Sequence, residues 1–215
     1  MYIKHISDTH GKLFYHDNKS NILIHSGDMF PNSNCILGGD IDGEIEFQRN
    51  WVKKNISLFP KEFLFVLGNH DFLDPNELES IFQDSGIKAI NLAGKVTNIG
   101  PFRVVGFSWI NFIAGRWKYE VFIPEMKEKV NELMQLIQEN EANMIVAHAP
   151  LEGILDYSLE HNKHFGNGVL RNSLDYEENN IEYYLHGHVH EAFGVSFQNG
   201  LFISNAATSC NYIEF

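Results

Sequence analysis

The sequence predicts a mixed α/β domain with more than one β-sheet, and three observations predict it. Short apolar segments that suit buried strands recur along the chain, amphipathic segments with helical spacing lie between them, and strand-like segments follow one another in the last third. At 215 residues, 44% of them hydrophobic and 20% charged, the chain can bury a sizeable core. Since no internal repeat or Pro/Ser-rich linker divides it, we expect one domain over residues 1–215.

The predicted strands are short apolar runs bounded by polar or glycine-containing segments. They are Tyr2–Ser7, Asn21–Ser26, Phe63–Leu67, Phe102–Phe107, Met144–Ala147 and Ile181–Leu185. Two further strands, Phe193–Gln198 and Leu201–Asn205, flank Asn199-Gly200, a dipeptide typical of a two-residue hairpin turn of type I′. The segment Leu151–Ser173 is expected to be a long loop that passes near the functional site.

Three helices are predicted between the strands. Glu44–Asn55 and Pro124–Glu139 carry apolar residues at helical spacing, which indicates one buried face in each. Pro75–Ser85 has clear boundaries, with Asp74 as the expected N-cap and Gly86 at the C-terminal end. We expect these apolar faces to be core packing, with the chemistry in loops at the carboxyl ends of strands.

The chain is acidic and rich in histidine. Its 28 Asp and Glu against 16 Lys and Arg give a formal charge of −12, which argues against an extended nucleic acid or an anionic membrane as a partner. Only two cysteines are present, Cys35 and Cys210, the latter expected to be a buried small residue. This number excludes a disulfide framework, and with no secretion signal or membrane-spanning run it favours the cytoplasm. The eleven histidines point to metal binding or acid/base chemistry.

Five predicted strands end in a carboxylate, amide or imidazole beside a small residue. The five segments are Ser7-Asp8-Thr9-His10-Gly11, His25-Ser26-Gly27-Asp28, Gly68-Asn69-His70-Asp71, Ala147-His148-Ala149-Pro150 and His186-Gly187-His188-Val189-His190. Oxygen and nitrogen donors without Cys suit Mn, Fe or Zn. At least seven candidate ligands are present: Asp8, His10, Asp28, Asn69, His148, His188 and His190. Seven ligands are too many for one tetrahedral ion but enough for two ions that share a carboxylate.

These motifs resemble the calcineurin-like metallophosphoesterase superfamily, whose pattern runs Asp-x-His, Gly-Asp, Gly-Asn-His-Asp/Glu, His and Gly-His-x-His. All five motifs are present, between Asp8 and His190. Segments around His188–Gly194, Asn205–Cys210 and Trp109–Tyr119 are similar to the branch of brain metallophosphoesterase-domain proteins and class III cyclic-nucleotide phosphodiesterases. The resemblance implies a four-layer αββα sandwich of two mixed β-sheets flanked by helices, with a dinuclear metal site.

The resemblance also implies a role for each motif residue. The first metal would be held by Asp8, His10 and His190, and the second by Asn69, His148 and His188. Asp28 and a water or hydroxide would bridge the two ions, and the hydroxide would attack phosphorus in line. His70 would lie over the leaving group, donating a proton or stabilising negative charge, and Asp71 would orient the His70 ring.

The remaining histidines have simpler expected roles. His186 precedes the Gly-His-x-His motif and is an alternative ligand, while His25 is expected beside the site or in packing. His5, His16 and His161 are expected to be ordinary surface or strand residues.

The substrate class is indicated by the residues after Asp28. Protein phosphatases and dinucleoside polyphosphate hydrolases of this superfamily resemble each other in a Gly-Asp-x-Val-Asp-Arg-Gly motif, whereas this chain reads Gly-Asp-Met-Phe-Pro-Asn and lacks the Arg. An Arg at that position would clamp a phosphate through two hydrogen bonds, so its absence favours phosphodiesters. The segment Trp109–Tyr119 is expected either to stack a nucleobase or to form a hydrophobic flap or dimer surface. The candidate substrate residues are Trp109, Arg116, Trp117 and His164.

We therefore expect a phosphodiesterase with two Mn, Fe or Zn ions that acts on small phosphoesters, with cyclic nucleotides among the candidates. A nuclease or phosphomonoesterase of the same superfamily is an alternative, and a catalytically silent scaffold of the same fold is another. The acidic composition argues against the nuclease, and the complete ligand set with His70 argues against the scaffold. The sequence leaves the oligomeric state open.

Overall fold

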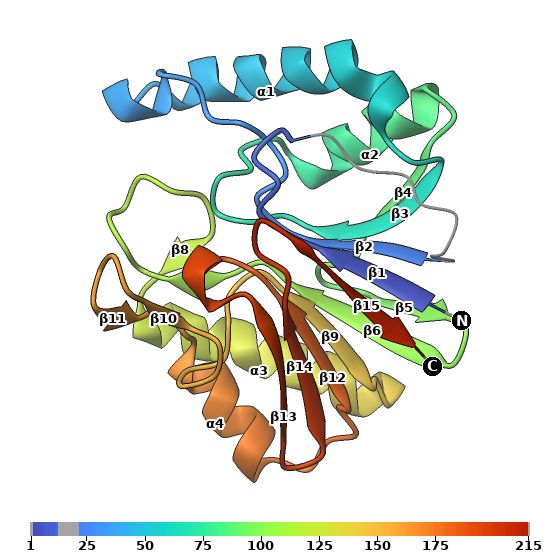
Figure 1. The fold of residues 1–215 in the computed structure, drawn as a ribbon, viewed down its shortest axis with the longest axis vertical. Coiled ribbons are helices and arrows are strands. Elements are labelled where there is room, and N and C mark those ends of the chain that lie inside the picture. The colour runs from blue at the N-terminus through green and yellow to red at the C-terminus, as the bar shows by residue number, and fades with distance from the viewer. Residues whose placement is uncertain (1, 13–21, 215) are drawn as a thin grey trace.

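The computed structural model describes residues 2–12 and 22–214, so the predicted strand residue Asn21 and His16 lie outside the described residues. Two β-sheets pack face to face, with α1 and α2 over one outer face and α3 and α4 over the other (Figure 1). The predicted four-layer αββα sandwich of mixed sheets is therefore confirmed. Two pairs of short strands, β7–β8 and β10–β11, lie outside the large sheets.

The first sheet has the strand order β15-β1-β2-β3-β4. Its strands are β1 Tyr2–Ile6, β2 Ile22–Ser26, β3 Glu62–Val66, β4 Lys88–Asn91 and β15 Cys210–Glu214. Strands β1 to β4 run parallel to one another, and β15 pairs antiparallel with β1 at the edge. The carboxyl ends of the parallel strands consequently meet at one edge of the sheet.

The second sheet has the order β13-β14-β12-β9-β6-β5. Its strands are β5 Val96–Ile99, β6 Phe102–Phe107, β9 Met144–Ala147, β12 Tyr183–His186, β13 Gly194–Gln198 and β14 Leu201–Asn205. Four central strands are parallel, and β5 and β13 are antiparallel edges. The predicted hairpin between β13 and β14 is present, with positive φ at Asn199 (53°) and Gly200 (84°), as a type I′ turn requires.

Successive side chains of each central strand point to opposite faces of its sheet. The buried side chains therefore form three core layers. In β3, Leu64 and Val66 face the other sheet, whereas Phe63 and Phe65 pack beneath the helices. In β9, Val146 belongs to the layer between the sheets. Because both faces of these strands are covered, their sequences are continuous apolar runs without a polar face.

The helices are α1 Ile41–Asn55, α2 Pro75–Asp84, α3 Ile123–Asn140 and α4 Gly168–Tyr176. At the start of α2, the Asp74 carboxylate accepts hydrogen bonds from the backbone N–H groups of Asn76 (2.9 Å) and Glu77 (3.2 Å). Helix α1 begins three residues earlier than predicted, because Asp40 caps it by accepting from the backbone N–H of Gly43 (2.9 Å). In the part of the chain that the structure describes, no helix is both long and apolar enough to cross a bilayer.

Several short elements complete the chain. They are the 3₁₀ turns Ile36–Gly38, Ile56–Leu58 and His190–Ala192, and the strands β7 Ile110–Asn111, β8 Glu120–Val121, β10 Tyr157–Ser158 and β11 Lys163–His164. The expectation of a long loop over 151–173 is wrong, because β10, β11 and the first part of α4 lie within that segment. Asn167 supplies the missed start signal, since its side chain accepts from the backbone N–H of Leu170 (3.0 Å).

Two residues differ from their predicted environments. Cys210 is only partly buried in the edge strand β15. His5 was expected at the surface or in a strand. It lies in strand β1, but it is fully buried. Its ring nitrogens lie 2.9 Å from Ser26 Oγ in the first sheet and 2.8 Å from Ser204 Oγ in the second, so His5 links the two sheets.

Candidate metal centre

The polar cluster predicted from the sequence is assembled at the carboxyl ends of five strands. Asp8 and His10 follow β1, and Asp28 follows β2. The remaining candidates follow β3, β9 and β12. Three overlapping groups have donor atoms within 4.8 Å of one another: Asp8 with His10 and His190, His10 with Asp28 and His70, and Asp8 with Asp28 and His148.

The two predicted ligand sets lie on either side of Asp28. In the first set, His190 Nε2 is 3.2 Å from Asp8 Oδ1, and the His10 and His190 ring centroids are 5.4 Å apart. His10 Nε2 is 3.9 Å from Asp28 Oδ2. This places the Asp28 carboxylate next to the first set.

In the second set, His148 Nε2 is 3.0 Å from Asn69 Oδ1 and 3.4 Å from Asp28 Oδ2. The His148 and His188 rings have centroids 4.9 Å apart. Five predicted ligands, Asp8, His10, Asp28, His148 and His190, thus belong to the groups of close donor atoms, whereas Asn69 and His188 adjoin them through His148.

The backbone at four of these positions is strained. Asp8, His10, Asp28 and His188 all have positive φ, between 44° and 73°. Such a conformation costs a non-glycine residue about 1–3 kcal/mol, and it persists only where surrounding contacts impose it. The clustering of strain at four candidate ligands indicates that the turns are shaped to direct these side chains inward.

The donor chemistry fits bound metal ions. His148 Nδ1 lies 2.9 Å from the carbonyl oxygen of Ser26, which takes the Nδ1–H and leaves the Nε2 lone pair facing Asn69 and Asp28. This arrangement is typical of a metal-ligating histidine. Oxygen and imidazole donors without sulfur suit Mn, Fe or Zn. The residues present therefore fit two ions that share Asp28.

In the metal-free site, the buried ionisable groups shift one another's pKa values. Burial opposes ionisation of Asp28, but the positive charge and the hydrogen bond of His148 outweigh it and hold the pKa of Asp28 well below its usual value. Burial also lowers the pKa of His148, while Asp28 outweighs it and raises that pKa to about 9. For His188, burial and the neighbouring His148 lower the pKa to about 3, so its ring nitrogens are available to a metal at neutral pH.

His70 lies at the margin of this cluster. Its Nε2 is 3.9 Å from Asp28 Oδ2, and its Nδ1 is 2.6 Å from Asn32 Nδ2. The ring lies against Trp117, with centroids 4.1 Å apart and planes inclined by 32°. The backbone is fixed as well, because the His70 N–H donates to Asp28 Oδ1 (2.8 Å).

The predicted contact between Asp71 and the His70 ring is wrong. The Asp71 carboxylate is fully buried and accepts hydrogen bonds from the backbone N–H groups of Met29 (2.8 Å), Phe30 (3.0 Å) and Gly68 (2.9 Å). Burial and the nearby Asp28 charge raise its pKa to about 7. Asp71 therefore ties the loop after β2 to the loop after β3, and the amide of Asn32 contacts the ring instead.

A cleft of about 500 Å³ opens over the cluster. It is lined by Asp28, Asn69, His70, Ile113, Trp117, Ser158, Glu160, His161, Lys163, Phe165, His188, Val189, His190 and Glu191. One wall comes from the segment after β7, and the other comes from the β10–β11 hairpin and Phe165. Sequence reasoning missed Asn32, Ile113, Lys163 and Phe165, and it assigned His161 to an ordinary surface position.

Only one of the four predicted substrate residues, Trp117, lines this cleft. Trp109 packs edge-on against Tyr119 with ring centroids 5.4 Å apart, next to the core under α3. Arg116 lies over Trp117, with its guanidinium carbon 5.5 Å from the ring centroid. His164 Nδ1 is 2.7 Å from Asp156 Oδ1. The predicted substrate positions of Trp109, Arg116 and His164 are therefore not found in the cleft.

The other two histidines near the motifs are buried beside the cluster. His25 Nε2 is 3.0 Å from Thr9 Oγ1, in agreement with its expected place beside the site. His186 Nδ1 lies 3.1 Å from the carbonyl oxygen of Gly187, and its Nε2 has no hydrogen-bond partner among the residues described. His186 therefore lies buried at the end of β12, beside the cluster.

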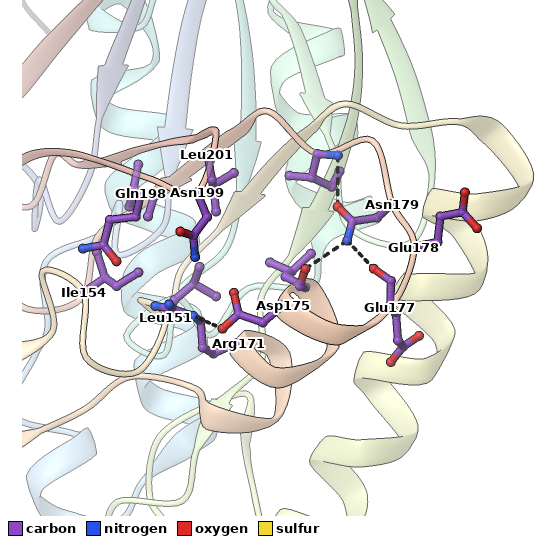
Figure 2. Close-up of a pocket in the computed structure, with 13 residues that line it drawn as sticks. Leu151, Ile154, Arg171, Asp175, Glu177, Glu178, Asn179, Gln198, Asn199 and Leu201 are labelled. Carbon is purple, nitrogen blue, oxygen red and sulfur yellow. Dashed lines mark hydrogen bonds and ion pairs between the residues drawn. The ribbon is translucent and has the colours of Figure 1, made fainter.

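A second hollow lies between α4 and the β13–β14 hairpin (Figure 2). Its volume is about 340 Å³, and its rim carries Arg171, Asp175, Asn179 and Asn199. None of the residues that line it belongs to the predicted ligand or catalytic sets. The chemistry-bearing side chains are therefore gathered in the cleft over Asp28.

With the fold and the geometry of this cluster established, comparison with known families identifies the family to which the chain belongs. The family model described as calcineurin-like phosphoesterase matches residues 1–192, and the chain belongs to that family. The resemblance to the calcineurin-like metallophosphoesterase superfamily is thereby confirmed.

Two solved structures are similar to the chain at low identity. A candidate 5′-nucleotidase from Staphylococcus aureus, in complex with alpha-ketoglutarate, is 16% identical with a TM-score of 0.52. A 5′-nucleotidase precursor from Thermus thermophilus is 12% identical with a TM-score of 0.44. Each match covers 95% of this chain and 48% of the other, so the chain spans about half the length of these structures. No curated protein matches the sequence.

Proposed function

We propose that the protein hydrolyses small phosphodiesters, with cyclic nucleotides among its candidate substrates, and that it uses two metal ions. The observation that carries this proposal is the position of Asp28, whose carboxylate lies beside both ligand sets and beside His70. A shared carboxylate between two ions is the arrangement used to act on both oxygens of an in-line displacement at phosphorus.

The ligands are assigned by their contacts. Asp8, His10 and His190 would hold one ion, and Asn69, His148 and His188 the other, with Asp28 shared. When bound, the ions would lower the pKa of water and offset the negative charge of the phosphoryl oxygens. They would also reduce the formal charge from −12 to −12 + 4 = −8, which lets a small anion approach an acidic protein.

The chain's own residues orient the substrate. His70 lines the cleft beside Asp28 and can donate a hydrogen bond from Nε2 to an oxygen of the substrate. Trp117 and Phe165 contribute aromatic surface to the cleft, and Lys163 contributes a cation. The cleft volume of about 500 Å³ suits a small ligand.

The charge of the cleft supports a diester over a monoester. No residue that lines the cleft in the described ranges is an arginine, and Glu160 and Glu191 lie on its wall. A monoester carries one more negative charge than a diester, and a guanidinium is the group best suited to bind it. The glutamates also disfavour an extended polyanion, so we propose small substrates and not nucleic acid.

Phosphomonoester hydrolysis is the second candidate, since the similar structure from Staphylococcus aureus is described as a candidate 5′-nucleotidase. We place either activity in the cytoplasm, a compartment that suits the free thiols of Cys35 and Cys210.

The proposal is tested by steady-state hydrolysis with added Mn²⁺. The substrates are bis-p-nitrophenyl phosphate, p-nitrophenyl phosphate and a panel of cyclic nucleotides and nucleoside monophosphates. We expect turnover of the diesters at higher kcat/KM than the monoesters, and its loss in Asp28→Ala. Preference for monoesters would favour the second candidate, whereas inactivity of metal-loaded protein on every substrate would leave the scaffold alternative.

A further inference from the structure

The ring of His70 is held from two directions by residues outside the motifs. Asn32, four residues after Asp28, places its side-chain Nδ2 2.6 Å from His70 Nδ1. Trp117 covers the ring at a centroid distance of 4.1 Å. The neighbouring Lys118 anchors this Trp, because its backbone N–H donates to the carbonyl oxygen of Asn69 (3.1 Å).

The contact with Asn32 determines which ring nitrogen carries the proton. An amide NH₂ group is a donor only, so His70 Nδ1 accepts from it and the ring hydrogen resides on Nε2. Nε2 is the nitrogen that faces Asp28, at 3.9 Å from Oδ2. The hydrogen of His70 thus points toward the place where the metal ligands converge.

We infer that Asn32 is a positioning residue, which orients the His70 ring with its Nε2–H directed at the substrate. The inference rests on the proposed function and assigns a role that the motifs do not contain. Such a ring donates a hydrogen bond to a phosphoryl or leaving-group oxygen. Because Asn32 occupies Nδ1, the ring meets the substrate through Nε2, the nitrogen that faces Asp28.

A double-mutant cycle tests whether Asn32 acts through His70. The variants are Asn32→Leu, His70→Ala and the double variant, with Asn34→Ala as a matched control at an exposed position of the same loop. We expect Asn32→Leu to lower kcat about 10–100-fold with little change in KM, and to cause no further loss in the His70→Ala background. An equal loss in both backgrounds, or a loss as large in Asn34→Ala, would overturn the inference.

A second measurement does not depend on activity or metal. Long-range ¹H–¹⁵N spectra of the metal-free protein at neutral pH report which nitrogen of His70 is protonated. We expect the proton on Nε2 in the wild type and on Nδ1 in Asn32→Asp, whose carboxylate accepts from Nδ1–H. Protonation of Nδ1 in the wild type contradicts the inference even if the enzyme is active, whereas inactivity with Nε2 protonated contradicts only the proposed function.

Discussion

Glycine precedes a candidate ligand in three of the motifs, and at the residue scale packing explains why. A Cβ on Gly68 would collide with Asp28 Oδ1, and one on Gly187 would collide with Ser7 Oγ and Asp8 Oδ2. The backbone of one motif therefore lies directly against the ligand of another. The Gly-Asn-His and Gly-His-x-His motifs therefore need glycine, because loops that are distant in the sequence approach closely there.

Gly187→Ala is predicted to weaken metal binding. The added methyl group displaces Asp8, so we expect at least about a tenfold loss of metal affinity and a matching loss of activity. Gly38→Ala is the control, because a Cβ there meets nothing within 4 Å. Metal titration followed by calorimetry measures the effect, and equal affinity in the two variants would show that the Gly187 contact is unimportant.

Two buried histidines differ in hydrogen bonding and should differ in their contribution to stability. His5 bonds to Ser26 and Ser204, so His5→Phe leaves two buried hydroxyls without this partner and costs about 1–3 kcal/mol or more. His186 Nε2 has no partner in the described parts of the chain, so His186→Phe should change stability by less than about 1 kcal/mol or increase it. Urea unfolding of the metal-free variants measures both, and a larger loss in His186→Phe would contradict this assignment.

The predicted ligands could be read from the sequence because each follows a strand in a fixed motif. The residues around them could not be predicted, since proximity along the chain does not determine the direction in which a side chain points. Trp109 and Trp117 lie in one predicted segment, yet Trp109 packs toward α3 and Trp117 toward His70. No sequence pattern indicated a role for Asn32, because its contact with His70 spans 38 residues and depends on the path of a loop.

At the scale of elements, strands covered on both faces were predictable, whereas of the edge strands only β13 was, because Asn199-Gly200 marks its hairpin turn. β9 is a fully buried apolar run and matches its predicted bounds. β4, β5 and β15 lie at sheet edges and contain polar residues, so their sequences lack a distinct strand pattern. Helix ends were predictable where a capping side chain preceded the apolar stripe, as at Asp74.

Removal of the α2 cap should destabilise the fold. Asp74→Ala leaves the backbone N–H groups of Asn76 and Glu77 without their acceptor and is expected to cost about 1 kcal/mol. Asp84→Ala, at the C-terminal end of the same helix, should be neutral or slightly stabilising because a negative charge is unfavourable there. Urea midpoints compare the two, and an equal loss in both would rule out a specific role for the cap.

At the scale of the whole molecule, the metal-free protein should lose stability in acid. Burial lowers the pKa of His25 to about 3, of His186 to about 4 and of His188 to about 3, and holds that of His5 well below its usual value. Because unfolding returns these rings to a pKa of about 6.5, the unfolded chain binds more protons below that pH. Their contribution to stability is therefore lost as the pH falls from about 6.5 to 4.

The carboxyl group of Asp71 changes the stability in the opposite direction as the pH falls. The pKa of Asp71 is raised to about 7, so its contribution to stability is present at low pH and lost as the pH rises toward 7. Four histidines outweigh this single group, and we expect the free energy of unfolding of metal-free protein to decrease between pH 6.5 and 4. Urea titrations across this interval measure it, and constant or rising stability in acid would contradict the balance.

The proposed function requires that this fold assemble two metal sites around one shared carboxylate. Elemental analysis of the protein, purified without chelator and then loaded with Mn²⁺, tests it most directly, with Asp28→Ala alongside. We predict two ions per wild-type chain and less than one per chain in the variant. A single ion in the wild type, or two ions that survive the loss of Asp28, would contradict the dinuclear centre.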